Sequence, residues 1–158
     1  MNTTKNSQNI ISDKTAKSIS CVIPVYNDEL TIEYIVNELI FTLENLKADY
    51  EIILINDGSP DRGGEIINKL ALAHKNIKTI HHKVNLGYGQ TLRDGFALAT
   101  KKFIFITDGD GQYEMRDLNQ AWFKVNERHA IIGYPRRRAD GLKRIVVSKI
   151  YNTLCLLF

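Results

Sequence analysis

Short apolar runs alternate along the chain with stretches of helical periodicity, and this alternation limits the possible folds more than any other feature. Runs of strand type stand at residues 18–25, 50–55, 77–81, 103–106 and 130–133. The first, second and fourth runs are expected to be buried on both faces. The stretches between the runs repeat apolar residues every three or four positions, as amphipathic helices do. Strands that alternate with helices predict an α/β fold with a mainly parallel sheet and flanking helices.

Local signals predict where two of the helices begin. Asn27 or Asp28 is expected to cap the first helix, whose apolar positions extend from Leu30. Ser59 followed by Pro60 predicts an N-cap with proline at the first helical position of the second helix. Two glycines that follow weaken that start.

Basic charge is concentrated near the C-terminal end. The chain of 158 residues has a net charge of +3. One short segment holds five basic residues against a single carboxylate, Asp140, and so carries +4; the basic residues are Arg136, Arg137, Arg138, Lys143 and Arg144. The rest of the chain is close to neutral, so a nucleic-acid-coating function is not expected.

Three further features concern the setting of the domain. Cys21 and Cys155 lack metal-ligand spacing, so both are expected to be free thiols in a reducing compartment. Residues 1–17 are polar without usable periodicity and are expected to form a mobile tail. No apolar run approaches the roughly 18 residues of a membrane span. A chain of this length forms one domain, or most of one.

Two aspartates follow the fourth apolar run directly. Asp108 and Asp110 stand one residue apart, and Gln112 follows. Open α/β sheets bind ligands outside the carboxyl ends of their strands. Two carboxylates and an amide oxygen suit a hard cation, so this stretch predicts a Mg²⁺ or Mn²⁺ site that could also hold a diphosphate. Adjacent His81 and His82 point to opposite faces of a strand, so a surface or strand-end role is expected for them rather than a shared metal.

The C-terminal segment 142–158 has one broad apolar face in helical projection. Three interpretations fit this pattern: a core-facing helix, an oligomer contact, or a helix in a membrane interface with its basic end at anionic headgroups.

Four motifs together resemble the family-two glycosyltransferases, which have the nucleotide-diphospho-sugar transferase (GT-A) fold. They are residues 22–29 (VIPVYNDE), 55–61 (INDGSPD), 85–89 (NLGYG) and 108–110 (DGD), in that family's order. The resemblance covers about residues 18–135, which are expected to form a nucleotide-sugar-binding catalytic domain. Family members usually continue with a further strand and helices, so the distal acceptor part is expected to be missing.

Within the family, the chain is most similar to the polyprenyl-phosphate sugar transferases, such as dolichyl-phosphate mannose synthase. Gln112 extends the acidic pair to an Asp-x-Asp-x-Gln pattern like that group's metal motif, and residues 136–148 look like its basic segment. The resemblance implies a metal-dependent, inverting transfer of a sugar from a UDP- or GDP-sugar to a polyprenyl phosphate. It also implies a cytoplasmic location, peripheral at the membrane face, with contact through residues 142–158.

The resemblance assigns roles on the donor side. Asp110 would be the main metal ligand, Asp108 would share the metal or hold the ribose, and Gln112 would add an oxygen. Asp57 would accept a hydrogen bond from uracil or guanine, or else serve as a turn or capping residue.

Two more loops would complete the donor pocket. Pro24, Tyr26 and Glu29 would form the first, with Tyr26 either stacked on the base or packed at the strand end. Asn85 and Gly87 belong to a glycine-containing loop that either contacts the nucleotide or turns the chain.

On the acceptor side, Arg136 and Arg138 would grip the donor diphosphate or the lipid phosphate, because guanidinium groups match phosphate oxygens bidentately. A solvated basic run is the alternative. Two other functions stay open: transfer to a polysaccharide or glycolipid acceptor, and nucleotide-sugar binding without catalysis.

Overall fold

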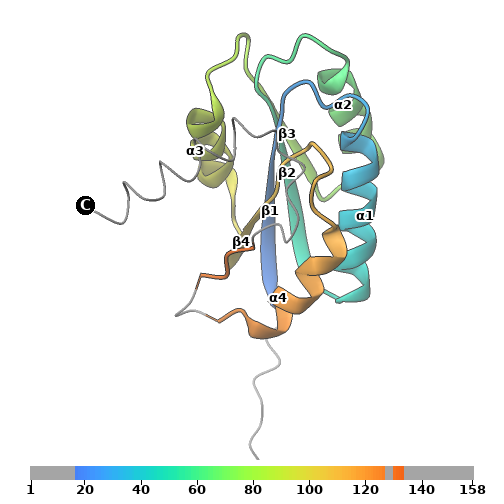
Figure 1. Ribbon diagram of the computed structural model, residues 1–158, viewed down its shortest axis with the longest axis vertical. Coiled ribbons are helices and arrows are strands. Elements are labelled where there is room, and N and C mark those ends of the chain that lie inside the picture. Colours follow the sequence, from blue (N-terminus) through green and yellow to red (C-terminus); the bar gives the residue numbers. More distant parts are fainter. Residues whose placement is uncertain (1–16, 127–129, 134–158) are drawn as a thin grey trace, which may run out of the picture. The chain divides into compact units, whose positions relative to one another are not determined.

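The computed structural model describes residues 17–126 and 130–133 (Figure 1). The chain divides into one unit that ends at Lys124 and a second that begins at Val125. In the second unit, residues 130–133 adopt no strand, so the expected fifth strand is wrong. An apolar run of only four residues is a weak signal for a strand, because periodicity cannot be judged over so short a stretch. The basic segment, the amphipathic segment and residues 1–16 of the predicted tail of residues 1–17 lie outside the described residues.

The first unit contains a four-stranded parallel sheet, which confirms the predicted fold class. The strands are β1 (Ser18–Val25), β2 (Asp49–Asn56), β3 (Ile77–His81) and β4 (Phe103–Ile106), in the order β3-β2-β1-β4. Because all strands are parallel, their carboxyl ends meet at one edge of the sheet, where α/β folds bind ligands.

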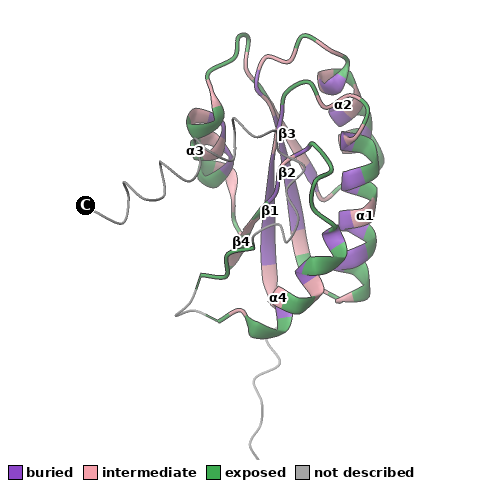
Figure 2. Ribbon diagram, viewed as in Figure 1, coloured by how far each residue is buried: buried purple, intermediate pink, exposed green. Residues whose placement is uncertain are grey.

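Helices cover both faces of this sheet (Figure 1). They are α1 (Ile32–Asn45), α2 (Gly63–Ala73), α3 (Tyr88–Leu98), the 3₁₀ turn η1 (Met115–Asp117) and α4 (Leu118–Lys124). The α1 and α2 face packs on the β1 side chains Ile19, Cys21 and Ile23, whereas α3 packs over Val22. Because successive side chains of β1 point to opposite faces of the sheet, this strand contributes to a hydrophobic core on each face. Figure 2 shows the buried residues of the strands in purple between the helical layers. No described helix is long and apolar enough to cross a membrane.

The fourth strand differs from its prediction, because one of its faces is partly buried and the other is exposed. Phe103 and Phe105 pack against the core on the α1 side, but Ile104 is 48% exposed and Ile106 is 41% exposed. The reason is positional: β4 lies at the edge of the sheet, and α3 contacts β1 and β2. An apolar run alone cannot distinguish a central strand from an edge strand.

Neither predicted helix cap forms. Thr31 occupies the N-cap position of α1, and the Asp28 carbonyl accepts the backbone bonds of Thr31 and Ile32 at 3.0 and 2.9 Å. The second helix begins at Gly63, several residues after Ser59. The loop before this helix has its own polar contacts. In it the Ser59 hydroxyl donates to Asp61 Oδ1 at 2.5 Å and does not cap the helix.

A buried glutamate, Glu51, joins three strands near their amino-terminal ends, opposite the edge at which the carboxyl ends meet. Glu51 Oε1 accepts hydrogen bonds from Ser20 Oγ at 2.6 Å and from the Thr100 backbone N–H at 2.6 Å, and Lys78 Nζ lies 2.7 Å from Oε2. Burial alone would raise the pKa of Glu51, but the bonds from Lys78, Ser20 and Thr100 outweigh it and lower this pKa to about 2. The ionised carboxylate therefore stabilises the fold.

We expect Glu51→Gln to remove a pH-dependent part of the stability. The folded pKa of about 2 lies below the ordinary value of 4.5, so the stabilisation is present above pH 4.5 and is lost as the pH falls towards 2. A shift of this size corresponds to about 3 kcal/mol. Urea unfolding measures the free energy of unfolding at pH 7 and at pH 3. We expect the values of wild type and variant to differ less at pH 3 than at pH 7. Glu33→Gln, on the exposed face of α1, is the control. An equal difference in the free energy of unfolding between wild type and Glu51→Gln at both pH values would contradict the account.

Candidate functional site

The acidic loop after β4 packs against the loop after β1. Thr31 Oγ1 donates to the Gly109 carbonyl at 2.6 Å. A Cβ placed on Gly109 would lie 2.7 Å from Asp28 Oδ2 and 3.2 Å from the Pro24 carbonyl, so glycine lets the two loops approach without displacing the Asp28 side chain. Asp28 thereby comes beside the predicted metal loop, a neighbour that the sequence did not indicate.

Negative charge gathers where these two loops meet. Burial raises the pKa of Asp28, and the charges of Asp110, Asp61 and Asp108 raise it further, although the Tyr26 backbone N–H opposes the shift. Burial and then Asp110 likewise raise the pKa of Asp108. Carboxylates that repel one another in this way would be stabilised by a bound cation.

The donor atoms at this place fit a hard divalent cation chemically, but they are not arranged as a complete ligand set. Asp110 Oδ1 accepts the Gln112 backbone N–H at 3.0 Å, with Gly111 between them at a φ of +77°. The Gln112 side chain is exposed. Among the described residues, no group of three or more His, Cys, Asp or Glu side chains is close enough to hold a metal. Asp108, Asp110 and Gln112 nevertheless supply oxygen atoms of the kind that Mg²⁺ and Mn²⁺ prefer.

The start of α3 reaches the same loop. The Tyr88 side chain lies beside the Asp108 carboxylate and opposes the rise in the pKa of Asp108. Burial raises the pKa of Tyr88, and the Asp108 charge adds to the shift. Tyr88 lies in the motif of residues 85–89, which was expected to act through the backbone freedom of its glycines, so the position of this side chain was not predicted.

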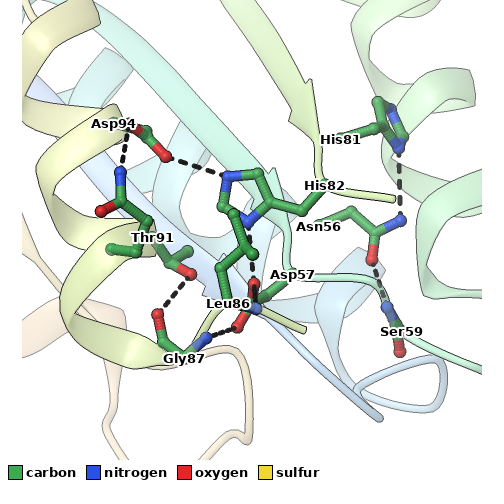
Figure 3. Close-up of polar contacts among 10 residues, drawn as sticks. Asn56, Asp57, Ser59, His81, His82, Leu86, Gly87, Thr91 and Asp94 are labelled. Atoms are coloured by element: carbon green, nitrogen blue, oxygen red, sulfur yellow. Dashed lines mark hydrogen bonds and ion pairs between the residues drawn. The ribbon is translucent and has the colours of Figure 1, made fainter. Parts of the chain in front are cut away.

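Asp57, at the end of β2, is 4% exposed and binds the loop that precedes α3 (Figure 3). Its Oδ1 accepts the Leu86 backbone N–H at 2.8 Å, and its Oδ2 accepts the Gly87 N–H at 2.9 Å. Burial would raise the pKa of Asp57, but bonds from His82, Leu86 and Gly87 lower it overall. Asp57 is therefore an ionised residue that fixes the position of a loop.

His82 lies between two carboxylates. Its Nδ1 is 2.7 Å from Asp57 Oδ1, and its Nε2 is 3.0 Å from Asp94 Oδ2 on α3. The side chain is only 7% exposed and directly follows the last residue of β3, so of the expected surface or strand-end role His82 has the strand-end one. His81 points elsewhere, towards the side chains of Asn56 and Asn68 (Figure 3). The three partners are far apart in sequence, which is why no local motif revealed them.

The loop after β1 is tied to the loop after β2. The Glu29 backbone N–H donates to Asp61 Oδ2 at 2.8 Å, and Glu29 Oε2 accepts the Arg62 N–H at 3.0 Å. The Asn27 N–H donates to Ser59 Oγ at 2.8 Å. Glu29 thus has a structural role as well as its predicted place in the pocket.

The remaining predicted donor residues border these loops. Tyr26 and Asn85 are exposed, and Pro24 is half-buried. Gly58 has a φ of +64°, and a Cβ there would lie 2.5 Å from the Val84 carbonyl carbon. The loops after β2 and β3 therefore touch through their backbones. Arg136 and Arg138 lie outside the described residues.

These features define an α/β domain of GT-A type, with polar loops gathered at the carboxyl edge of its sheet. The chain belongs to glycosyl transferase family 2, which it matches over residues 20–153. The expected family is thereby confirmed.

Solved structures with the same fold include TarS and a mannosyltransferase. Staphylococcus aureus TarS 1-349 in complex with UDP-GlcNAc is 22% identical, with a TM-score of 0.60 over 78% of this chain and 37% of that one. Mannosyltransferase PcManGT from Pyrobaculum calidifontis, in complex with GDP-Man and Mn²⁺, is 20% identical, with a TM-score of 0.57 over 66% of this chain and 30% of that one. This chain thus spans about a third of the length of these neighbours.

Proposed function

We propose that this chain is the donor-binding part of a metal-dependent, inverting glycosyltransferase that moves a sugar from a UDP- or GDP-sugar to a polyprenyl phosphate. The observation that carries the proposal is the meeting of the Asp108–Asp110 loop with the loops after β1 and β3 at one edge of the sheet. The neighbours bound to UDP-GlcNAc and to GDP-Man with Mn²⁺ support a nucleotide-sugar donor.

Asp108, Asp110 and Gln112 would hold a divalent ion. Such an ion acts as a Lewis acid that stabilises the charge gained by the departing diphosphate. Tyr88 lies beside the Asp108 carboxylate. Asp57 would face the base, and Pro24, Tyr26 and Glu29 would line the pocket together with Asn85 and Gly87.

The acceptor assignment rests on the basic segment. Arg136 and Arg138 would position the lipid phosphate through paired hydrogen bonds. A phosphate monoester is largely ionised at neutral pH, since its second pKa is about 6, so a strong general base is not required. Residues 142–158 would lie against the cytoplasmic face of the membrane, where they could also contact a second copy.

Transfer to a polysaccharide or glycolipid acceptor is the second candidate, because the donor side described above serves either acceptor. A turnover assay with Mn²⁺ and UDP- or GDP-sugars, with and without a polyprenyl phosphate, separates them. We expect lipid-dependent release of the nucleotide, and we expect Arg136→Ala with Arg138→Ala to lower it while Arg93→Ala on α3 does not. Lipid-independent turnover would favour the second candidate, and donor binding without turnover would mean a non-catalytic subunit.

A further inference from the structure

We propose that His82 and Asp94 are positioning residues for the nucleotide-sugar pocket. They act through Asp57, whose carboxylate they hold against the loop that precedes α3. The inference rests on the proposed function and deepens it, because it names two residues outside the family motifs that set the affinity for the donor.

The hydrogen-bonding capacity of the three side chains supports this role. Carboxylate oxygens only accept hydrogen bonds, and a neutral imidazole has a single N–H. Both ring nitrogens of His82 nevertheless lie within 3.0 Å of a carboxylate oxygen, at Asp57 and at Asp94. A contact is attractive when the ring nitrogen that faces the carboxylate carries a hydrogen, so an imidazole with both N–H groups would donate to Asp57 and to Asp94 at once.

The contacts continue from the trio to the predicted metal loop. Asp57 fixes the backbone N–H groups of Leu86 and Gly87. Gly87 is the N-cap residue of α3, and its carbonyl accepts Thr91 Oγ1 at 3.0 Å. The side chain of the next residue, Tyr88, lies beside Asp108.

The helix α3 is thus attached at two places. Gly87 binds Asp57 at its start, and Asp94 binds His82 further along. Gln90 Nε2 donates to Asp94 Oδ1 at 2.9 Å and restrains that carboxylate. Losing the second attachment would let the start of α3 shift, and with it the loop that faces the donor.

A purely structural role for the trio makes a different prediction. It would lower the stability of every variant in proportion to the bonds lost, without a separate effect on ligand affinity. Asp94 is the better position for the test, because its side chain is 33% exposed whereas Asp57 and His82 are almost fully buried.

The test is calorimetric titration of the full chain with UDP and with GDP in the presence of Mn²⁺. We expect Asp94→Ala to weaken the affinity about tenfold, the effect of losing one charged hydrogen bond. Asp94→Asn should restore it to within about threefold, since its amide oxygen can still accept the Nε2–H. Asp49→Ala, which removes an aspartate–lysine pair at the opposite edge of the sheet, is the matched control for Asp94→Ala, and His81→Ala is a control for a neighbouring histidine.

Hydrogen exchange at the Leu86 and Gly87 amides provides a second readout that needs no ligand. Faster exchange in Asp94→Ala, restored in Asp94→Asn, is the expected result. If Asp94→Ala does not fold, Gln90→Ala gives the same comparison with a smaller loss. Unchanged affinity and exchange in these variants would overturn the inference alone, whereas a wild type that binds neither nucleotide would overturn the proposed function and the donor role of the trio with it.

Discussion

Asp110→Ala is expected to abolish the Mn²⁺-dependent stabilisation of this chain by nucleoside diphosphates. Asp110 would be the main ligand of the cation, and the cation in turn would hold the diphosphate. Outer-shell partners of metal ligands are already worth about 10- to 100-fold, so removing a ligand should cost about 100-fold or more. Thermal shift with UDP or GDP measures the loss directly, because a ligand that binds the folded state raises its apparent stability.

The ligand-free protein should change little in that variant. Asp110 is exposed and belongs to a group of carboxylates that repel one another, so its removal relieves repulsion. Asp117→Ala is a suitable control, since it removes an exposed aspartate that lies only a few residues further on. A nucleotide-induced shift that persists in Asp110→Ala and still depends on Mn²⁺ would rule out Asp110 as the metal ligand.

Asp57→Ala is expected to lower the free energy of unfolding by about 2–4 kcal/mol, because it leaves two backbone donors and His82 without their acceptor. For a domain of this size, such a loss lowers Tm by about 10 °C. Nucleotide binding should be lost as well, since the loop before α3 is no longer held.

Urea unfolding and hydrogen exchange at Leu86 and Gly87 test this prediction. Asp57→Asn should fall between wild type and Asp57→Ala, because an amide keeps one accepting oxygen in the same space. Asp49→Ala, at the start of β2, removes an exposed carboxylate and should stay within about 0.5 kcal/mol of the wild type. A similar stability of Asp57→Ala and wild type would mean that these hydrogen bonds contribute nothing to the fold.

The sequence predicted the strands β1 to β4 because they depend on local patterns. The ranges predicted for β1 and β3 agree with the structure, and that for β2 agrees to within a residue at each end. Parallel pairing then places the loops after the strands at a common edge, which needs no knowledge of the side-chain contacts.

The features that the sequence missed depend on contacts between distant residues. The exposure of Ile104 follows from the position of β4 at the edge of the sheet, which the apolar run itself does not reveal. Asp28 lies beside Asp110 only because β1 and β4 are neighbours. His82 meets Asp57 and Asp94 across separations of 25 and 12 residues, beyond the reach of any motif.

The most direct test of the account is calorimetric titration of the full chain with UDP and with GDP, each with and without Mn²⁺. We predict that one of the two nucleotides binds at a single site and that Mn²⁺ strengthens its binding at least about tenfold, as expected for a cation that bridges carboxylates and diphosphate. Absence of binding by both nucleotides in the presence of Mn²⁺ would contradict the assignment of this edge of the sheet as a nucleotide-sugar site.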